Sequence, residues 1–146
     1  MENRLMMKIC ARSENEAFAR SAVAAFCLPL CPTVDEVNDI KTAVSEAVTN
    51  AVVHAYPSGE GEICLSARYG GDGVLHIEVA DTGKGIACVD QAMQPFFTTG
   101  EAEERSGMGF TVMRTFTDGL QVESTPGVGT VVRMQKRIGT AAGDDE

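Results

Sequence analysis

The sequence predicts an α+β fold: a mostly antiparallel sheet with helices on one face, forming a two-layer α/β sandwich. Segments with alternating apolar residues occur in neighbouring pairs, at 62–69 with 74–80 and at 120–124 with 129–137, and short glycine-containing turns join them. Residues 34–55 instead carry apolar side chains at helical spacing. Hairpins that are separated along the chain from helices are typical of this fold class.

The N-terminal part should form one strand and one helix. The strand is expected over residues 5–11. Ser13 and Glu16 then match a capping box, in which the serine hydroxyl accepts from the third amide and the glutamate returns to the serine amide. This pattern predicts a helix that begins here and runs to about Leu28, before Pro29.

A second capping box predicts the start of the longest helix. Thr33 and Glu36 have the required spacing, directly after Pro32. The helix is expected to continue to about Ala55. Its apolar residues recur at helical intervals and are Val37, Ile40, Val44, Ala47, Val48, Ala51 and Val52.

The remaining elements are predicted from turn residues and from the two hairpins. Glycines close a turn at 70–73, and residues 81–86 interrupt regular structure. A short helix is expected near 88–93, a polar and mobile loop at 94–106, and a third long helix at 108–116. One domain is therefore predicted over 1–137, followed by a small, acidic and disordered tail at 138–146.

Charge restricts the function classes. The chain has 146 residues, and 12 Lys and Arg against 21 Asp and Glu give a net charge of −9. This acidity argues against nucleic acid or an anionic membrane as a partner. No apolar run approaches the roughly 20 residues of a membrane span, and residues 1–11 show no secretory signal. We therefore expect a cytoplasmic protein with no membrane and no nucleic acid among its partners.

Cysteine usage agrees with a reducing compartment. The five cysteines, at positions 10, 27, 31, 64 and 88, are an odd count and are expected to be free thiols. Cys27 and Cys31 have the spacing of a short ligand pair, which leaves a metal–thiolate site as the minor alternative. A structural zinc site needs four ligands, usually in two close pairs, and the sequence offers no second pair.

One stripe of the 34–55 helix is polar. Glu46, Asn50 and His54 follow at intervals of four, so they share one side of the helix. A glutamate in a cleft can act as a general base, and an asparagine oxygen can bind a hard cation. The alternative for the stripe is a solvated polar face, and for His54 packing under the helix end is favoured.

Glycines follow the strand at 74–80. Asp81 stands at the end of that strand, and Gly83 and Gly85 would let a backbone approach a ligand closely. A plain glycine turn is the alternative. The segment lacks the third glycine and the helix of a dinucleotide fingerprint.

Two further glycine segments lie later in the chain. Residues 106–110, Ser-Gly-Met-Gly-Phe, open a helix whose free amides and dipole suit a phosphate. Residues 127–130 form a turn that places Thr130 at the start of a strand, within reach of a site beside Asp81. A flexible helix start and a plain hairpin turn are the respective alternatives.

Together and in this order, these motifs resemble those of the Bergerat-fold, or GHKL, ATP-binding superfamily. Glu46 and Asn50 resemble its N box, and residues 81–85, 107–109 and 127–130 resemble its three glycine boxes. The resemblance covers about residues 5–137. It implies that ATP or ADP binds with Mg²⁺ against the sheet, under a mobile lid.

Longer runs are similar to one branch of that superfamily, the anti-sigma factor serine kinases of spore-forming bacteria. The matching runs are residues 11–16 with 18–20, 45–51, 95–99 and 104–110. One departure is Gly100, since relatives commonly carry a basic residue after the two lid threonines. Arg105 is then expected to be the lid cation that faces the phosphates.

The resemblance implies a role for each matching residue. Glu46 would take the proton from a substrate serine as it attacks the γ-phosphoryl group, and Asn50 would bind Mg²⁺. Asp81 would accept a hydrogen bond from the adenine amino group, completed by Thr130 through water. The other implied nucleotide contacts are Gly83, Gly85, Ile86, Thr98, Thr99, Arg105, Ser106, Gly107, Met108, Gly109 and Phe110.

The resemblance also implies protein partners. In this family the substrate serine belongs to an anti-anti-sigma protein, and the kinase binds and inhibits a sporulation sigma factor as a homodimer. Arg20 matches a position that contacts both partners; without the resemblance, a solvated surface arginine is favoured. The alternatives are a general-stress anti-sigma kinase, a detached histidine-kinase-type ATP-binding domain, and a binding module in which nucleotide only shapes a partner surface.

Overall fold

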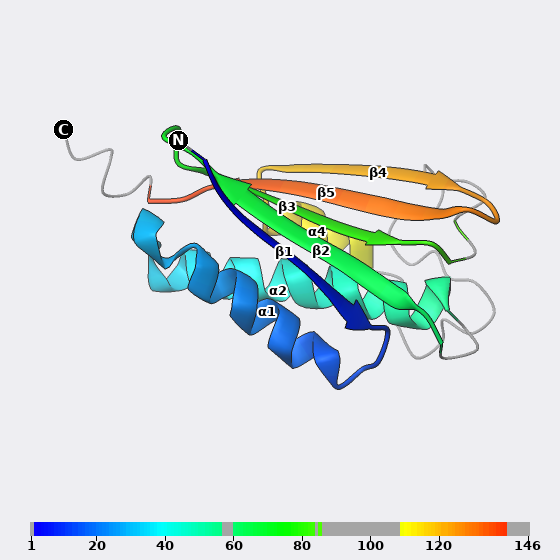
Figure 1. Ribbon diagram of the computed structural model, residues 1–146. Helices are drawn as coiled ribbons and strands as arrows, with labels where there is room; N and C mark the ends of the chain where they lie inside the picture. The colour runs from blue at the N-terminus through cyan, green and yellow to red at the C-terminus, as the bar shows by residue number, and fades with distance from the viewer. Residues whose placement is uncertain (1, 57–59, 84, 86–108, 140–146) are drawn as a thin grey trace.

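The computed structural model of the chain describes residues 2–56, 60–83, 85 and 109–139. In these residues the strands form one antiparallel sheet in the order β1-β2-β3-β5-β4, and helices cover one of its faces (Figure 1). The predicted α+β class and the antiparallel sheet are confirmed. The strands are β1 (Asn3–Cys10), β2 (Glu62–Tyr69), β3 (Val74–Asp81), β4 (Gly119–Thr125) and β5 (Gly129–Arg137), and the helices are α1 (Asn15–Phe26), α2 (Val34–Asn50) and α4 (Gly109–Thr115).

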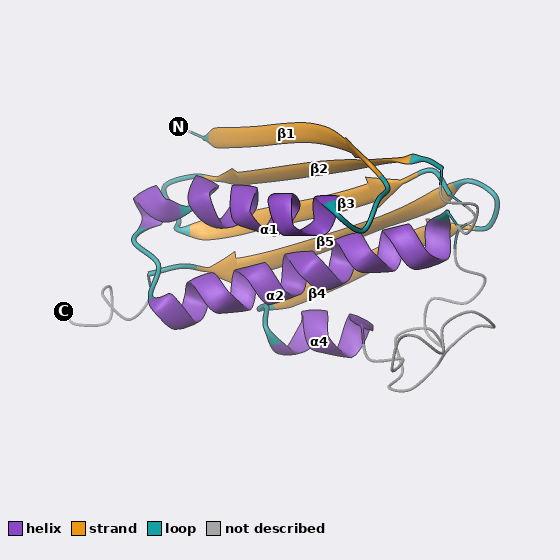
Figure 2. Ribbon diagram, turned by 90° about the horizontal axis from the view of Figure 1, so that it is seen from below, coloured by secondary structure: helices purple, strands orange, loops and turns teal. Residues whose placement is uncertain are grey.

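Helix α2 lies between α1 and α4 against the sheet (Figure 2). Most of its predicted apolar stripe is buried, with Ile40, Val44 and Val48 fully inaccessible to solvent, while Val37 and Val52 are half-buried. The three inaccessible residues join a core that includes sheet residues of the inner face, such as Leu65 and Met134. Burying each large apolar side chain of this kind contributes about 1.5–3 kcal/mol, so α2 is fixed firmly on the sheet.

The capping box predicted at the start of α2 is confirmed. The Glu36 amide donates to Thr33 Oγ1 at 3.0 Å, and the Thr33 amide donates to Glu36 Oε1 at 2.9 Å. The same Oε1 atom also accepts from the Gly139 amide at 3.0 Å, and Ile138 is buried. The end of β5 is thereby tied to the start of α2, and the folded part of the chain extends through Gly139.

The capping box predicted at Ser13 is wrong. Helix α1 begins at Asn15, and its N-cap residue Glu14 makes no side-chain cap bond. The Glu16 carboxylate does not return to the Ser13 amide because Arg20 holds it, with Arg20 Nη1 at 2.6 Å from Glu16 Oε2. An ion pair one helical turn away thus replaces the local cap.

The helical segment around α2 ends as predicted but with a different geometry. Residues Ala51–Ala55 continue α2 as a π-helix, labelled η2, and Tyr56 follows it. A π-helical turn is wider than an α-helical turn and is frequently found at functional sites. After α1, a 3₁₀ turn, η1 (Leu28–Leu30), takes the place of the predicted last helical residues.

The hairpins match the sequence prediction to within about two residues at their ends, as is usual for element boundaries. In the 70–73 turn, the Gly73 amide donates to the Gly70 carbonyl at 3.3 Å, and Gly73 has φ +76°. The predicted helix at 88–93, the loop at 94–106 and most of the predicted tail lie outside the described residues.

Candidate functional site

A pocket lies at one end of the sheet, between the α2–η2 segment and the strands β3 and β5. Asn50 at the end of α2 and His54 on η2 line this pocket, together with Asp81 on β3 and Thr130 on β5. Four of the site residues predicted from sequence therefore meet here: Asn50, Asp81, Gly85 and Thr130. The other lining residues are small or apolar: Ala47, Ala51, Ala55, Val79 and Val132.

The Asp81 carboxyl is the acidic group of this pocket. Its Oδ1 atom accepts from the Gly83 amide at 2.9 Å and from the Thr130 amide at 3.3 Å. Burial raises the pKa of Asp81, and these two amide bonds oppose that rise. Among the residues that line the pocket, alanine and valine side chains provide apolar walls beside this carboxyl group.

Close backbone contacts explain three glycines around Asp81. A Cβ atom at Gly83 would overlap the Ala55 backbone, and one at Gly85, which has φ +78°, would overlap the Thr125 carbonyl. A Cβ atom at Gly129 would overlap the carbonyl oxygen of Asp81. These glycines therefore allow protein backbones to approach one another, which holds the end of β3 between η2 and the β4–β5 turn.

The Tyr56 hydroxyl links the segments next to Asp81, and the sequence analysis did not predict this role. It donates to the Glu62 carbonyl at 2.7 Å and accepts from the Thr82 amide at 2.8 Å. The Tyr56 ring lies where a side chain at Gly61 would be. One side chain thus joins the end of η2 to the start of β2 and to the residue after Asp81. No local pattern in the sequence signals this contact.

Most of the chain matches one protein family. Residues 9–136 match the family model described as "Histidine kinase-like ATPase domain". A protein named "Anti-sigma F factor" from Caldanaerobacter subterraneus subsp. tengcongensis is 58% identical over 137 residues, which cover 94% of this chain and 95% of the relative. One with the same name from Geobacillus thermodenitrificans is 50% identical and covers 94% of each chain.

The chain belongs to the anti-sigma F factor family. This membership also places it among the histidine kinase-like ATPase domains. Solved structures agree on the fold: the RsbU and RsbW domains of Rv1364c from Mycobacterium tuberculosis match with a TM-score of 0.68 at 20% identity. That match covers 93% of this chain and 32% of the other. A blue-light activated histidine kinase from Erythrobacter litoralis matches with a TM-score of 0.60 at 21% identity, covering 84% and 42%.

In this anti-sigma F factor homologue, the two residues that resemble an N box lie on one helix. Glu46 and Asn50 are both half-buried on α2. Asn50 lines the pocket, and Glu46 lies one helical turn before it. His54 is half-buried and lines the pocket with Asn50. His54 therefore lines the pocket, whereas the sequence analysis favoured packing under the end of the helix.

The later predicted contacts fall into two groups. Ile86, Thr98, Thr99 and residues 105–108 lie outside the described residues. Gly109 and Phe110 open α4, where Phe110 is buried in the core. Its side chain therefore anchors α4 in the core, where α4 contacts α2 and β4.

Arg20 is half-exposed and is held by two neighbours. Its Nη1 atom lies 2.6 Å from Glu16 Oε2 and 3.3 Å from Ser45 Oγ. Ser45 directly precedes Glu46 on α2. The prediction of an outward-pointing Arg20 holds in part, since 41% of its side chain is exposed, and the side chain also bridges α1 to the N-box helix.

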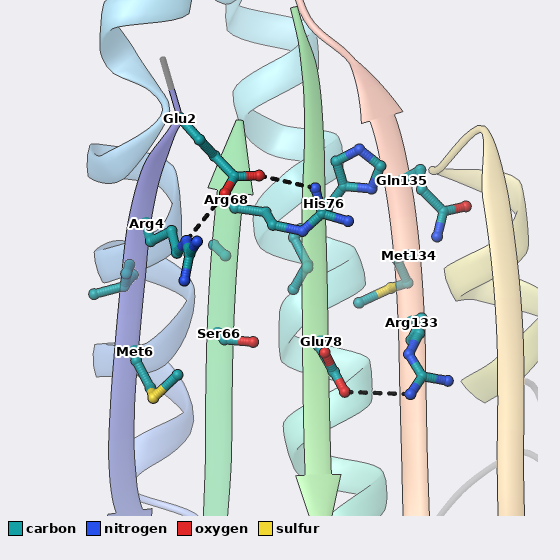
Figure 3. A pocket seen from close by; sticks show the side chains of 13 residues that line it. Glu2, Arg4, Met6, Ser66, Arg68, His76, Glu78, Arg133, Met134 and Gln135 are labelled. Atoms are coloured by element: carbon teal, nitrogen blue, oxygen red, sulfur yellow. Dashed lines mark hydrogen bonds and ion pairs between the residues drawn. The ribbon is translucent and has the colours of Figure 1, made fainter. Parts of the chain in front are cut away.

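A second hollow lies on the open face of the sheet, opposite the helices (Figure 3). Glu2 contacts Arg4 at 3.0 Å and Arg68 at 3.1 Å, and these cations hold the pKa of Glu2 below its usual range. Glu78 and Arg133 form another pair at 3.6 Å. Opposite charges are thus matched across this face, which carries none of the predicted site residues.

Within the described ranges, no group of three or more His, Cys, Asp or Glu residues is placed to hold a metal ion. Cys27 is buried, and this burial raises the pKa of its thiol, while Cys31 is exposed. Among the helices that the structure describes, none has the length and hydropathy needed to cross a bilayer.

Proposed function

We propose that this protein is an ATP-dependent serine kinase that phosphorylates an anti-anti-sigma protein and that, as a homodimer in the cytoplasm, it binds and inhibits a sporulation sigma factor. One observation carries the kinase part. Asp81, Thr130 and Asn50 line the same pocket. Asn50 lies one helical turn from Glu46 on α2. Adenine recognition and phosphoryl transfer need these groups in one site.

The pocket favours adenine at the Asp81 end. Alanine and valine side chains provide the apolar walls, and the carboxylate accepts from an amino group. Guanine presents a carbonyl oxygen at the corresponding position, so the carboxylate would repel it. This placement leaves the phosphates to extend toward Asn50 and the start of α4.

The donor set fits a magnesium ion that comes with the nucleotide. Mg²⁺ commonly takes one or two protein oxygens and completes its shell with phosphates and waters. Asn50 offers one carbonyl oxygen on the pocket wall. When bound, the ion would neutralise charge on the phosphates.

Glu46 supplies the base in this proposal. The substrate serine oxygen forms a bond to the γ-phosphorus, the bond from that phosphorus to the β–γ bridging oxygen breaks, and ADP leaves. The serine proton passes to the Glu46 carboxylate. Positioning and charge neutralisation provide most of the remaining rate enhancement.

The experiment is an incubation with ATP labelled on the γ-phosphate, Mg²⁺ and the anti-anti-sigma protein of the same organism. We expect label on a serine of the partner that survives acid treatment. Acid-labile label would indicate phosphohistidine and the histidine-kinase alternative. ATP binding without any transfer would leave only a nucleotide-dependent binding module.

The regulatory part has its own test. The names of the relatives support a sigma factor as a partner. Analytical ultracentrifugation with a sporulation sigma factor is expected to show a dimer of this chain that takes up the sigma factor. A monomer that takes up no sigma factor would contradict this part while leaving the kinase part standing.

A further inference from the structure

The pairing between β2 and β3 ends beside the pocket. Ile63 and Asp81 are the last partners, and continuing their register would place Glu62 opposite Thr82. The Tyr56 hydroxyl stands between these two residues instead, because it donates to the Glu62 carbonyl at 2.7 Å and accepts from the Thr82 amide at 2.8 Å. A side chain from the end of η2 therefore bridges the two backbones where they separate.

The tyrosine that makes this bridge is fixed in place. Tyr56 is 9% exposed and belongs to the core, and its ring lies in the space that a side chain at Gly61 would take. The amide can only donate and the carbonyl can only accept, so a phenol hydroxyl, which does both, satisfies the two groups at once. The Thr82 hydroxyl lies 3.4 Å from the same oxygen.

The bridge is connected to the Asp81 carboxyl through the next residue of the chain. Gly83 follows Thr82, and its amide donates to Asp81 Oδ1 at 2.9 Å. The backbone of Ala55, the residue before Tyr56, lies where a side chain at Gly83 would be. Two consecutive residues of each segment are thus in contact. The position of the Gly83 donor depends on where the Tyr56 hydroxyl holds Thr82.

We propose that Tyr56 is a positioning residue, whose hydroxyl holds residues 81–83 in the arrangement in which the Asp81 carboxyl binds the base of ATP. Asp81 lines the pocket, and Tyr56 is not among the lining residues, so Tyr56 acts through Thr82 and Gly83. This inference rests on the proposed ATP site. Without the hydroxyl, the Glu62 carbonyl and the Thr82 amide can bond to each other directly. Such a bond would draw Thr82 toward β2 and Gly83 away from Ala55.

The first test is Tyr56→Phe, which keeps the ring against Gly61 and removes only the hydroxyl. We expect the dissociation constant and the KM for ATP to rise roughly tenfold, the effect of losing about one buried hydrogen bond. The kcat for transfer to the anti-anti-sigma protein should stay nearly normal at saturating ATP, because Glu46 and Asn50 on α2 are unchanged. A merely structural loss would reduce the fraction of active protein, and so the apparent kcat, at an unchanged KM.

The matched control is Tyr69→Phe, which alters the other of the two tyrosines in the chain. The Tyr69 hydroxyl accepts from Asn3 Nδ2 at 3.0 Å. This bond lies at the opposite end of β2 from Glu62. The control also loses one hydroxyl and one hydrogen bond, and it is expected to keep the KM for ATP of the unmodified protein.

A second measurement uses the unmodified protein, so it holds even if Tyr56→Phe does not fold. Coupling between two sites is reciprocal, so a bridge that supports ATP binding must itself be stabilised by ATP. Saturating ATP is expected to slow hydrogen exchange of the Thr82 amide roughly tenfold. The reference is the Gly73 amide, which bonds to the Gly70 carbonyl in the turn before β3 and should change little.

Three results would overturn the inference. They are an unchanged KM for ATP in folded Tyr56→Phe, a loss of kcat alone in that variant, and a Thr82 amide that ATP protects no more than the Gly73 amide. If the unmodified protein binds no ATP, the proposed function itself fails, which is a distinguishable outcome.

Discussion

The backbone of Ala55 fills the space in which a side chain at Gly83 would lie. Ala55 ends the π-helical continuation of α2, and Gly83 is the second residue after β3. The Gly83 amide also donates to Asp81 Oδ1 at 2.9 Å. The end of the N-box helix and the acceptor of the pocket are therefore held together by one close backbone contact.

Gly83→Ala is expected to destabilise the protein and to weaken ATP binding. The added methyl group would force η2 and the Asp81–Gly83 segment apart, and overpacking of this kind costs about 1–3 kcal/mol. Denaturant unfolding measures the stability, and calorimetry measures the affinity. Gly71→Ala is the matched control: a Cβ atom there meets nothing within 4 Å, so its effect should stay within about 0.5 kcal/mol. Equal behaviour of the two variants would contradict the contact.

Asp81→Asn is expected to separate stability from function. The amide oxygen can still accept from the Gly83 and Thr130 amides, while the carboxylate is removed. ATP affinity, measured by calorimetry, should fall by about 1–3 kcal/mol because an acceptor facing the base is lost. Unaltered affinity in a folded variant would place the adenine elsewhere.

The raised pKa of Asp81 predicts how Asp81→Asn changes the stability of the protein at neutral pH. Its folded pKa is raised above 3.8, so ionisation is harder in the folded than in the unfolded state. The resulting loss of stability begins as the pH rises through the unfolded pKa and is complete above the folded pKa. At pH 7, Asp81→Asn should therefore be at least as stable as the unmodified protein in denaturant unfolding. A less stable variant at pH 7 would contradict the sign.

The sheet and α2 could be predicted because their signals are local. Alternation defines β2 and β5, and the Thr33–Glu36 capping box is formed as the sequence indicates. The Ser13–Glu16 box has an equally good pattern and is absent, because Arg20 competes for Glu16. The Glu16 carboxylate could either cap the helix or pair with Arg20, and in the structure it pairs with Arg20.

The site could be predicted from sequence only in part. Asn50, Asp81 and Thr130 were identified and meet in the pocket. Tyr56 was missed because its contacts depend on strand pairing and on packing between segments distant in sequence. A tyrosine after a helix is ordinary until the fold places it between Glu62 and Thr82.

Glu46→Gln is expected to uncouple phosphoryl transfer from nucleotide binding. The amide keeps the size of the side chain on α2 and removes the proton acceptor. Transfer to the anti-anti-sigma protein should fall about a hundredfold or more, with nearly normal ATP affinity. Glu123→Gln, on an exposed side chain of the open face, is the control and should transfer at the normal rate. Normal transfer by Glu46→Gln would remove Glu46 from its proposed role.

Arg20→Ala is expected to weaken partner binding while sparing the pocket. Arg20 lies on α1 and does not line the pocket that contains Asp81 and Thr130, and arginine is enriched among residues that dominate interfaces. The Arg20 side chain is 41% exposed, and Glu16 and Ser45 bond to its guanidinium group. These bonds hold the side chain in a fixed orientation, which lowers the entropy lost on binding. Titration with each partner separately, at fixed nucleotide and fixed salt, should show a loss of about 2 kcal/mol or more.

The matched control for Arg20 is Arg4→Ala, which removes the same charge from the open face of the sheet. A loss of partner affinity shared by both variants would reflect net charge alone, since the chain becomes more acidic by one unit in each. A loss confined to Arg20→Ala would locate the contact on α1.

Arg20 also bonds to Ser45, the residue before Glu46, so the rate of phosphoryl transfer should be measured in Arg20→Ala as well. Transfer measured at saturating partner should be nearly normal, because the missing contact acts on binding. Equal affinity of Arg20→Ala and the unmodified protein for both partners would return Arg20 to the role of a solvated surface residue.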